Sequence, residues 1–364
     1  MPKRLPIPQL ERLHIEVTNV CNFKCEFCPD AIMQRRRGHM DPVLLEQILE
    51  EVAATQLARV IAFHLMGEPL IYPYIFQGIH MAVERGLNLH LTSNGSTFAL
   101  WPEHIEKLIR SRLPKLTISL QTPDPVTFTL RGAPPRLSPE RYFQGITDFL
   151  QAHLRSESPT QVHLKFLDTS PHPFLVPHKA LSVINSGQQM RAELSAWATR
   201  ALQGIPDAPD PDWMGSRIAA HRPGRWQQIR LHPRLVLETF PLDSWGNVET
   251  KHVIPARWGY CNGVSGQAGV LCDGTVVPCC KDYEGRIPLG KLALGGSLGE
   301  ILAGQPACAL RQGFNRLQVN NPVCQRCMGG DTPGKALARQ AGSIAYFKVY
   351  RPLKQKLEPG WGEV

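Results

Sequence analysis

The sequence predicts an α/β fold in which a parallel sheet is followed by a second, smaller domain. Short apolar segments of strand type alternate with longer segments of helical periodicity from residue 12 to residue 240, and this alternation indicates a parallel sheet. The ten cysteines include one tight group after the first expected strand and a second group beyond residue 260. With 364 residues, the chain is long enough for two domains.

The first expected element is a strand over Arg12–Thr18, where apolar and polar residues alternate. Asp41 supplies an N-cap and Pro42 stands at the first helical position, so a helix is expected over 42–54. Further strands are expected over 58–65, 87–92, 115–120, 161–167 and 226–240. Further helices are expected over 74–85 and 102–111, from Ser138 onward, over 187–203, after Ser297 and over 335–349.

Residues 168–225 are interrupted by prolines and carry one expected helix. The stretch 204–225 is interpreted as a loop, as a lid over the active site or as an insertion. Three histidines in this region lack the spacing of metal ligands and are interpreted as loop residues: His172, His178 and His221.

Cys21, Cys25 and Cys28 lie within eight residues, directly after the first expected strand. Three thiolates this close can wrap around one metal centre, and three ligands suit a [4Fe–4S] cluster that keeps one iron open for another molecule. Zinc with a fourth ligand elsewhere is one alternative, and three ordinary core or loop cysteines are another.

Polar motifs follow the next strands at their carboxyl ends, where parallel barrels build their sites. Gly67 and Glu68 follow the second strand, and Asn94 with Gly95 follows the third. Glycine lets the backbone approach a ligand closely, and a carboxylate accepts hydrogen bonds from an ammonium group. Taken alone, each of these motifs is an ordinary turn.

A hairpin is expected over Val270–Val277, where two apolar stretches flank an Asp-Gly pair. Cysteines surround it: Cys261 precedes it, Cys279 ends it, and Cys324 and Cys327 follow downstream. Four thiolates can close one tetrahedral zinc site or one [4Fe–4S] cluster, and the chemistry leaves the metal open. The remaining cysteines are expected to be small buried apolar groups without a role: Cys272, Cys280 and Cys308.

The net charge of +9 and the pI of about 9.1 fit an acidic partner, such as nucleic acid, a phosphorylated substrate or an acidic peptide, or simply a basic surface. The densest basic run is Arg35 to Arg37. In one interpretation it lies near the mouth of the metal site and contacts a substrate anion; in the other it is a solvated loop.

No apolar run has transmembrane length and Met1–Pro6 has no signal-peptide pattern, so a cytoplasmic protein without a membrane partner is expected. Because residues 1–11 form only a short Pro-rich lead, no separate peptide-binding domain is expected before the first strand.

The Cys-x3-Cys-x2-Cys motif after an N-terminal strand resembles the radical S-adenosylmethionine (radical SAM) enzymes. The second cysteine set resembles the twitch domain, the shortened SPASM domain of the same superfamily. This resemblance implies a partial (β/α)6 TIM-like barrel followed by a small twitch/SPASM-like domain with a β-hairpin and a helix. The implied boundaries are 1–240 for the barrel, with 168–225 as a possible insertion or lid, 241–330 for the auxiliary domain and 331–364 for a C-terminal tail.

The resemblance also implies S-adenosylmethionine and two [4Fe–4S] clusters as cofactors. The implied ligands are Cys21, Cys25 and Cys28 for the first cluster and Cys261, Cys279, Cys324 and Cys327 for the second. Gly67 and Glu68 would hold the amino group of S-adenosylmethionine, although Met66 replaces the first glycine of the family's Gly-Gly-Glu-Pro motif. The other residues implied near this cofactor are Ser93, Asn94, Ser119, Gln121 and Arg131.

In this superfamily a 5′-deoxyadenosyl radical takes a hydrogen atom from the substrate. The expected function is oxidation or another modification of a small polar metabolite, with the auxiliary cluster as electron relay and flavodoxin or ferredoxin as electron donor. Maturation of a ribosomally synthesised peptide is the alternative, and a zinc-stabilised, basic nucleic-acid-binding protein is a distant one. His163 and Lys165 share one face of the fifth strand and are candidate substrate or proton-transfer residues, unless that face points outward. Asp243 and Trp245 are further candidates on the substrate side.

Overall fold

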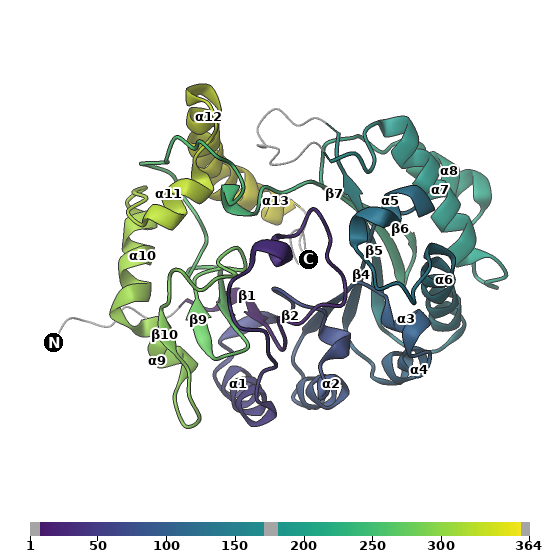
Figure 1. The fold of residues 1–364 in the computed structure, drawn as a ribbon, viewed down its shortest axis with the longest axis horizontal. Coiled ribbons are helices and arrows are strands. Elements are labelled where there is room, and N and C mark those ends of the chain that lie inside the picture. Colours follow the sequence, from purple (N-terminus) through teal and green to yellow (C-terminus); the bar gives the residue numbers. More distant parts are fainter. Residues whose placement is uncertain (1–7, 171–180, 358–364) are drawn as a thin grey trace.

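The computed structural model describes residues 8–170 and 181–357, which form one ten-stranded sheet with flanking helices (Figure 1). The strand order is β10-β9-β8-β1-β2-β3-β4-β5-β7-β6, and neighbouring strands from β8 to β7 are parallel. The strands span Leu10–Ile15 (β1), Ala58–Phe63 (β2), Leu89–Ser93 (β3), Lys115–Gln121 (β4), Gln161–Asp168 (β5), Gln227–His232 (β6), Leu235–Pro241 (β7), Gln267–Val270 (β8), Thr275–Val277 (β9) and Gly290–Lys291 (β10). The predicted α/β fold with a parallel sheet is therefore confirmed.

Helices cover the outer side of the curved sheet, as Figure 1 shows for α1, α2, α4 and α6. The expected N-caps are confirmed, since Asp41 accepts a hydrogen bond from the Val43 amide at 2.8 Å and Ser138 accepts one from the Arg141 amide at 3.3 Å. The helices span Pro42–Thr55 (α1), Ile75–Glu84 (α2), Thr97–Leu100 (α3), Glu103–Arg110 (α4), Pro125–Phe128 (α5), Pro139–Arg155 (α6), Gly187–Leu202 (α7), Pro211–Ala219 (α8), Leu298–Ala303 (α9), Gln305–Asn315 (α10), Pro322–Met328 (α11), Pro333–Ile344 (α12) and Arg351–Leu357 (α13).

The two faces of the barrel strands differ in polarity. In β4, Leu116 and Ile118 belong to the apolar core that the helices cover, whereas Lys115 and Thr117 alternate with them. Because successive side chains of a strand point to opposite faces, Lys115 and Thr117 point into the barrel. The inner face of β4 is consequently polar, and it lines the part of the fold that carries the candidate site.

The prediction of one strand over 226–240 is wrong. The segment forms two antiparallel strands, β6 and β7, which pair Gln227 with Thr239 and Ile229 with Leu237. Pro233 lies in the turn between them, where a backbone without an N–H group costs no ladder hydrogen bond. β7 is the sixth parallel strand of the barrel and pairs with β5, while β6 forms the edge of the sheet.

The stretch 204–225 is not only a loop, because it contains α8, whose N-cap Asp210 accepts hydrogen bonds from two amides at 2.9 Å. α8 packs against α7 and β6 on the outer side, and no described residue of 181–225 lines the barrel cavity. The described part of this segment is therefore not a lid. His221 is buried and hydrogen-bonds to the Thr239 hydroxyl at 3.1 Å, while His172 and His178 lie outside the described residues.

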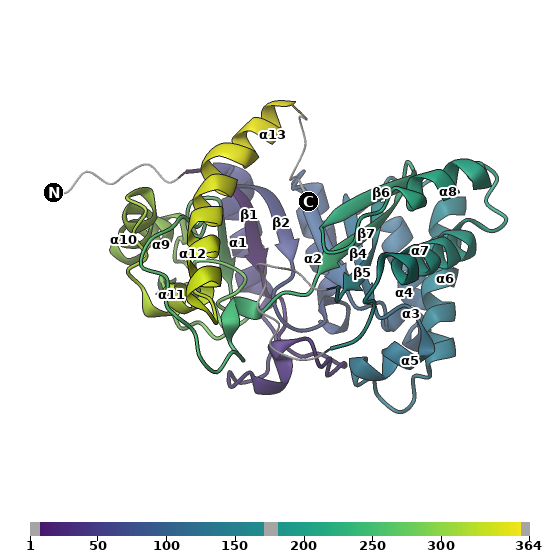
Figure 2. The ribbon, with the colours of Figure 1, turned by 90° about the horizontal axis from the view of Figure 1, so that it is seen from above.

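The sheet continues from the barrel into the region of the second cysteine set. β8 pairs in parallel with β1, and β8 and β9 form the expected antiparallel hairpin. Beyond this region, the helix predicted over 335–349 is longer: α12 continues through a π-helical turn at Ala345–Tyr350 into α13 (Figure 2). Arg351 of α13 forms an ion pair with Glu11 of β1 at 2.5 Å, which fixes this end to the barrel. No helix in the described parts of the chain has the length and apolar character needed to cross a membrane.

Candidate active site

A cavity of about 420 Å³ extends through the interior of the barrel. Its lining at the carboxyl ends of the strands includes every residue expected at the first cluster and at S-adenosylmethionine, although these residues come from five separate segments of the chain. They are Cys21, Cys25, Cys28, Gly67, Glu68, Ser93, Asn94, Ser119, Gln121 and Arg131. The fold thus brings the whole set together around one space.

The Cys loop, residues 16–41 between β1 and α1, docks on the turn after β2. Gly67 has a φ of +78°, and a Cβ there would lie 2.4 Å from the Thr18 carbonyl oxygen and 2.8 Å from that of Val20. The Glu68 amide donates a hydrogen bond to the same Val20 oxygen at 2.9 Å. Glycine at position 67 is therefore required both for its backbone conformation and for the close approach of the two loops.

A Gly67→Ala variant is expected to lose the first cluster, because the added methyl group forces the Cys loop away from β2. Gly86→Ala is the matched control: its φ of +66° imposes similar backbone strain, but a Cβ there meets nothing within 4 Å. Gly86→Ala should cost about 1–2 kcal/mol of stability and keep all its iron. Iron per chain after anaerobic reconstitution compares the two variants, and equal iron contents would contradict the crowding argument.

The Cys loop also docks on the segment after β3. Asn22 donates a hydrogen bond to the Ser96 hydroxyl at 2.8 Å and accepts one from the Asn94 side chain at 3.0 Å. The Asn94 carbonyl in turn accepts a hydrogen bond from the Tyr142 hydroxyl at 2.7 Å. In this structure Asn94 thus holds the Cys loop in place, and its amide lies 3.9 Å from the Cys21 sulfur.

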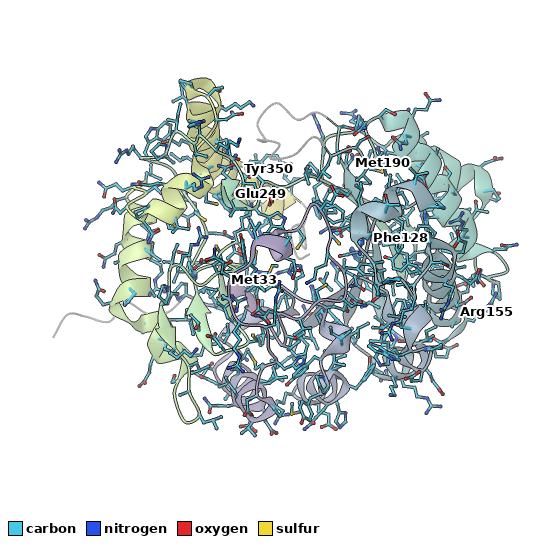
Figure 3. All side chains as sticks on the ribbon, in the orientation of Figure 1. Met33, Phe128, Arg155, Met190, Glu249 and Tyr350 are labelled. Atoms are coloured by element: carbon cyan, nitrogen blue, oxygen red, sulfur yellow. The ribbon has the colours of Figure 1, made fainter. Side chains whose placement is uncertain are left out.

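A third contact of the Cys loop was not apparent from the sequence. The Lys24 amide donates to the Arg131 carbonyl and the Glu26 amide donates to the Leu130 carbonyl, both at 2.9 Å. Gly132 permits this pairing, since its φ is +51° and a Cβ would lie 2.8 Å from the Lys24 carbonyl oxygen. Phe23 completes the contact by packing on Phe128, which Figure 3 labels, at 6.0 Å between ring centroids.

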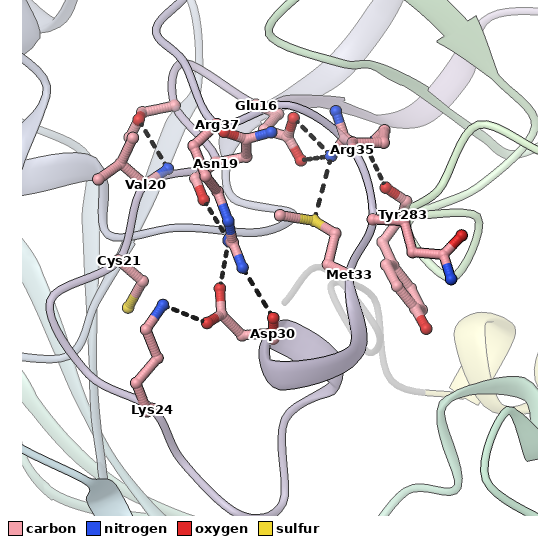
Figure 4. Close-up of polar contacts among 12 residues, drawn as sticks. Glu16, Asn19, Val20, Cys21, Lys24, Asp30, Met33, Arg35, Arg37 and Tyr283 are labelled. Atoms are coloured by element: carbon pink, nitrogen blue, oxygen red, sulfur yellow. Dashed lines mark hydrogen bonds and ion pairs between the residues drawn. The ribbon is translucent and has the colours of Figure 1, made fainter.

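The basic run Arg35 to Arg37 is neither a solvated loop nor a free anion site, so both of its interpretations are wrong for Arg35 and Arg37. Arg35 binds both carboxylate oxygens of the buried Glu16, at 2.8 and 2.7 Å (Figure 4). Arg37 binds the Asp30 carboxylate at 2.5 Å and the Asn19 carbonyl at 2.8 Å. These two arginines therefore brace the Cys loop, and only Arg36 is exposed.

The three thiols of the Cys loop suit a metal centre rather than free cysteine chemistry. Burial, together with the neighbouring Cys25, raises the pKa of Cys28 to about 12. Burial likewise raises the pKa values of Cys21 and Cys25. Thiols with raised pKa values stay protonated at neutral pH, whereas metal ions bind thiolates and remove the protons. The Arg131 guanidinium lies beside this group and offers a positive charge to a thiolate-bound cluster.

Two neighbouring groups fit the two ends of the methionine part of S-adenosylmethionine. Glu68 is 1% exposed and accepts hydrogen bonds from the Asn94 and Leu70 amides, but forms no ion pair with any described residue. Burial raises its pKa, and a bound ammonium group would relieve that cost. Arg131 Nη1 donates hydrogen bonds to three oxygens of β4. Its Nε is buried and has no partner among the described residues, so the Nε edge of the guanidinium is available to bind a carboxylate.

The second cysteine set lines a separate cavity of about 80 Å³, which includes Cys261, Cys279, Cys324 and Cys327. α11 carries the last two, and its N-cap Asn321 accepts hydrogen bonds from the Val323 and Cys324 amides at 2.9 and 3.4 Å. Burial, followed by the nearby Cys261 and Cys327, raises the pKa of Cys324 to about 12. The four thiols therefore stand close enough to influence one another.

Neither cysteine set is arranged around a single ion. Within residues 8–170 and 181–357, no three His, Cys, Asp or Glu side chains are placed to hold one metal ion. The thiolates of a [4Fe–4S] cluster bind different irons, so they stand further apart than the ligands of one zinc ion. Thiolate-only donor sets are also the usual ligands of iron–sulfur clusters.

Comparison with known proteins supports these assignments at the level of the family. The model of the radical SAM superfamily matches residues 15–163, and the model of an iron–sulfur cluster-binding domain, SPASM, matches residues 261–328. The chain contains a radical SAM domain followed by a SPASM domain. S-adenosylmethionine and [4Fe–4S] clusters are the cofactors that these two models imply, so the zinc-stabilised nucleic-acid-binding alternative loses its support.

Curated relatives match this radical SAM protein only in part. The S-adenosyl-L-methionine-dependent 2-deoxy-scyllo-inosamine dehydrogenase of Niallia circulans is 37% identical over 60 residues, which are 16% of this chain and 24% of the relative. The tungsten-containing aldehyde ferredoxin oxidoreductase cofactor-modifying protein of Pyrococcus furiosus is 29% identical over 87 residues, 24% of each chain. The matched segments thus span about a quarter of these relatives.

Solved structures support the fold. SuiB of Streptococcus suis bound to S-adenosylmethionine has a TM-score of 0.54 at 16% identity, and the match covers 83% of this chain and 68% of that one. SuiB bound to its precursor peptide SuiA has a TM-score of 0.52 at 16% identity, covering 85% and 68% of the two chains. At this identity the likeness shows a shared fold.

The catalytic candidates of β5 meet a residue that the sequence did not single out. Glu238 of β7 is buried, 3.1 Å from the Lys165 ammonium and 2.9 Å from His163 Nδ1. Burial alone would raise the pKa of Glu238, but Lys165, His163 and Trp226 together lower it below its usual range. Lys165 and Glu238 line the cavity, whereas His163 is buried and does not line it. This face of β5 therefore does not point outward.

Trp245 and Lys281 line both the barrel cavity and the cavity of the second cysteine set. The Trp245 indole donates to the Phe27 carbonyl of the Cys loop at 3.0 Å, and Lys281 forms an ion pair with Asp243 at 2.6 Å. Cys280 lines the barrel cavity while its neighbour Cys279 lines the other, so the two thiols point in opposite directions, as successive residues of an extended segment do. A short segment thus separates the two metal sites.

Proposed function

We propose that this radical SAM protein oxidises a small polar metabolite and that the second cluster takes part in the electron transfer. The observation that carries the proposal is the pair of cavities that share Trp245 and Lys281 as lining residues. When bound, the cofactors would supply the one-electron chemistry that removes a hydrogen atom and an electron from the substrate. Flavodoxin or ferredoxin is the proposed source of the first electron.

The residues of the chain have separate proposed roles in binding the cofactors and in proton transfer. The Cys21, Cys25 and Cys28 thiolates hold the first cluster, and Glu68 with Arg131 orients the amino acid end of S-adenosylmethionine. The proposed ligands of the second cluster are Cys261, Cys279, Cys324 and Cys327. Lys165 Nζ and Glu238 Oε1, 3.1 Å apart, face the substrate and can pass the substrate's proton between them.

The stoichiometry of the products tests this proposal. Anaerobically reconstituted protein with a chemical reductant should form one 5′-deoxyadenosine for each product that is two hydrogen atoms lighter than the substrate. A methylated or adenosylated product would overturn the proposed oxidation. A product of unchanged mass would assign the protein to radical rearrangement instead.

Maturation of a ribosomally synthesised peptide is the second candidate. It is favoured by the likeness to the fold of SuiB, which was solved with a precursor peptide, and by the net charge of +9, which suits an acidic leader. A gene for a short peptide beside the gene of this chain would give the substrate to test. Cross-linking or oxidation of that peptide, with one 5′-deoxyadenosine per modification, would select this candidate over the first.

A further inference from the structure

The inner faces of β1, β3 and β4 carry cationic and imidazole side chains. Arg12 and His14 come from β1, His90 from β3 and Lys115 from β4, and all four line the cavity. Lys115 precedes Ser119 by four residues on the same face of β4, so it lies about 13 Å further down the barrel. This group, the barrel floor, is distinct from the residues proposed for S-adenosylmethionine.

Most charged side chains of the cavity have partners. Lys165 pairs with Glu238 at 3.1 Å, and Lys281 pairs with Asp243 at 2.6 Å. At the mouth, Asp30 is paired with Lys24 and Arg37. The Lys165–Glu238 and Lys281–Asp243 pairs are electrically neutral, whereas Asp30 at the mouth is shared by two cations.

Lys115 and Arg12 lack such partners. Lys115 is 6% exposed and, like the side chain of Arg12, makes no ion pair or hydrogen bond with the described residues. Burial, opposed by Glu238 and assisted by Arg12 and Lys165, lowers the pKa of Lys115 to about 8. At neutral pH both side chains are therefore mainly cationic.

The histidines of the barrel floor do not add charge but can add hydrogen bonds. Burial lowers the pKa of His14 to about 3 and that of His90 to about 2, so both are neutral at pH 7. The Nδ1 atom of each is buried and has no partner among the described residues. Two cations with unused hydrogen-bonding groups beside them cost folding free energy unless an anion binds between them.

We propose that Lys115 and Arg12 bind a carboxylate or phosphate group of the substrate, which places the reacting C–H bond between this anion and the first cluster. The proposal rests on the proposed oxidation of a small metabolite and names its class, a small organic anion. The depth of the barrel floor favours a small molecule, because a peptide could reach Lys115 only with one side chain. A terminal carboxylate or phosphate, by contrast, can enter the cavity with the rest of its molecule.

Binding of inorganic phosphate and of succinate tests this inference on protein that holds its clusters and S-adenosylmethionine. Calorimetry should show both anions binding to the wild type, with putrescine as a cation that does not bind. Lys115→Met and Arg12→Gln should each weaken binding at least ten-fold, while Arg12→Lys, which keeps the charge, should weaken it less. Lys107→Gln removes the same charge from the outer helix α4 and should change binding less than two-fold.

The outcomes separate this inference from the proposed function. If phosphate and succinate bind no better than putrescine, or if Lys115→Met and Lys107→Gln bind them alike, the anion site does not exist. Formation of 5′-deoxyadenosine in the same preparations reports on radical chemistry independently of anion binding. The Tm of Lys115→Met should equal or exceed that of the wild type, since a buried unpaired cation is removed. If Lys115→Met does not fold, anion binding by Arg12→Gln tests whether the site exists.

Discussion

A Cys21/Cys25/Cys28→Ala variant is expected to lose half of its iron and all cleavage of S-adenosylmethionine. Wild-type protein with two [4Fe–4S] clusters should hold about eight irons per chain, and the variant about four. The three thiols line the barrel cavity, whereas the second set lines a cavity of its own, so each cluster should load without the other. Iron and sulfide per chain after anaerobic reconstitution, with 5′-deoxyadenosine as the activity readout, measure the effect.

Cys272 and Cys308 provide the matched control, because neither lines one of the two metal cavities. A Cys272→Ala/Cys308→Ala variant should keep about eight irons. A Cys324→Ala/Cys327→Ala variant should also drop to about four, while still forming 5′-deoxyadenosine. If the Cys loop variant lost all of its iron, the second set would be a zinc site or empty, and the proposed electron transfer would be wrong.

The carboxyl-end part of the site could be predicted because its residues follow strands in short motifs. Cys21, Glu68 and Asn94 each stand directly after an expected strand, and a parallel sheet brings such ends together. The contact between Gly132 and the Cys loop escaped prediction for the opposite reason. It depends on the path of an irregular loop after β4, which no local pattern describes.

The position of Lys115 in the barrel floor follows from a sequence pattern in β4. In β4 the polar residues Lys115, Thr117, Ser119 and Gln121 recur at every second position and all line the cavity. Only the two at the carboxyl end were assigned to the site. Polar residues at this period within a buried strand indicate an interior face, so Lys115 could have been placed there from the sequence.

The Glu238 contacts could not have been predicted without strand register. His163 and Glu238 are 75 residues apart in sequence, and their contact follows from the pairing of Lys165 with Glu238 in the β5–β7 ladder. The expected single strand over 226–240 would have placed β7 without its hairpin partner. Trp226, which donates to Glu238 at 3.0 Å, reaches it only because β6 folds back antiparallel to β7.

An Arg35→Met variant is expected to be destabilised by about 3–5 kcal/mol, because it leaves a buried carboxylate without its cation. The Glu16 side chain is fully buried; Arg35 Nη2 binds both of its oxygens, while Arg35 Nε donates to the Tyr283 carbonyl at 2.5 Å. The Cys272 amide donates to Glu16 at 3.1 Å, so the pair joins the Cys loop to the hairpin region of β8 and β9. Anaerobic thermal unfolding should show a Tm lower by about 5 °C, with less iron in the first cluster.

Two controls separate the lost ion pair from the lost side chain. Lys291→Met breaks an exposed pair with Asp273, in which both side chains are more than half exposed, and should cost less than about 1 kcal/mol. A Glu16→Leu/Arg35→Met double variant removes both charges and should recover most of the stability, because the unpaired carboxylate is gone. If Arg35→Met and Lys291→Met unfolded at the same temperature, the Glu16–Arg35 pair would not hold the Cys loop to the second domain. The position of the first cluster would then depend on the other contacts of the Cys loop.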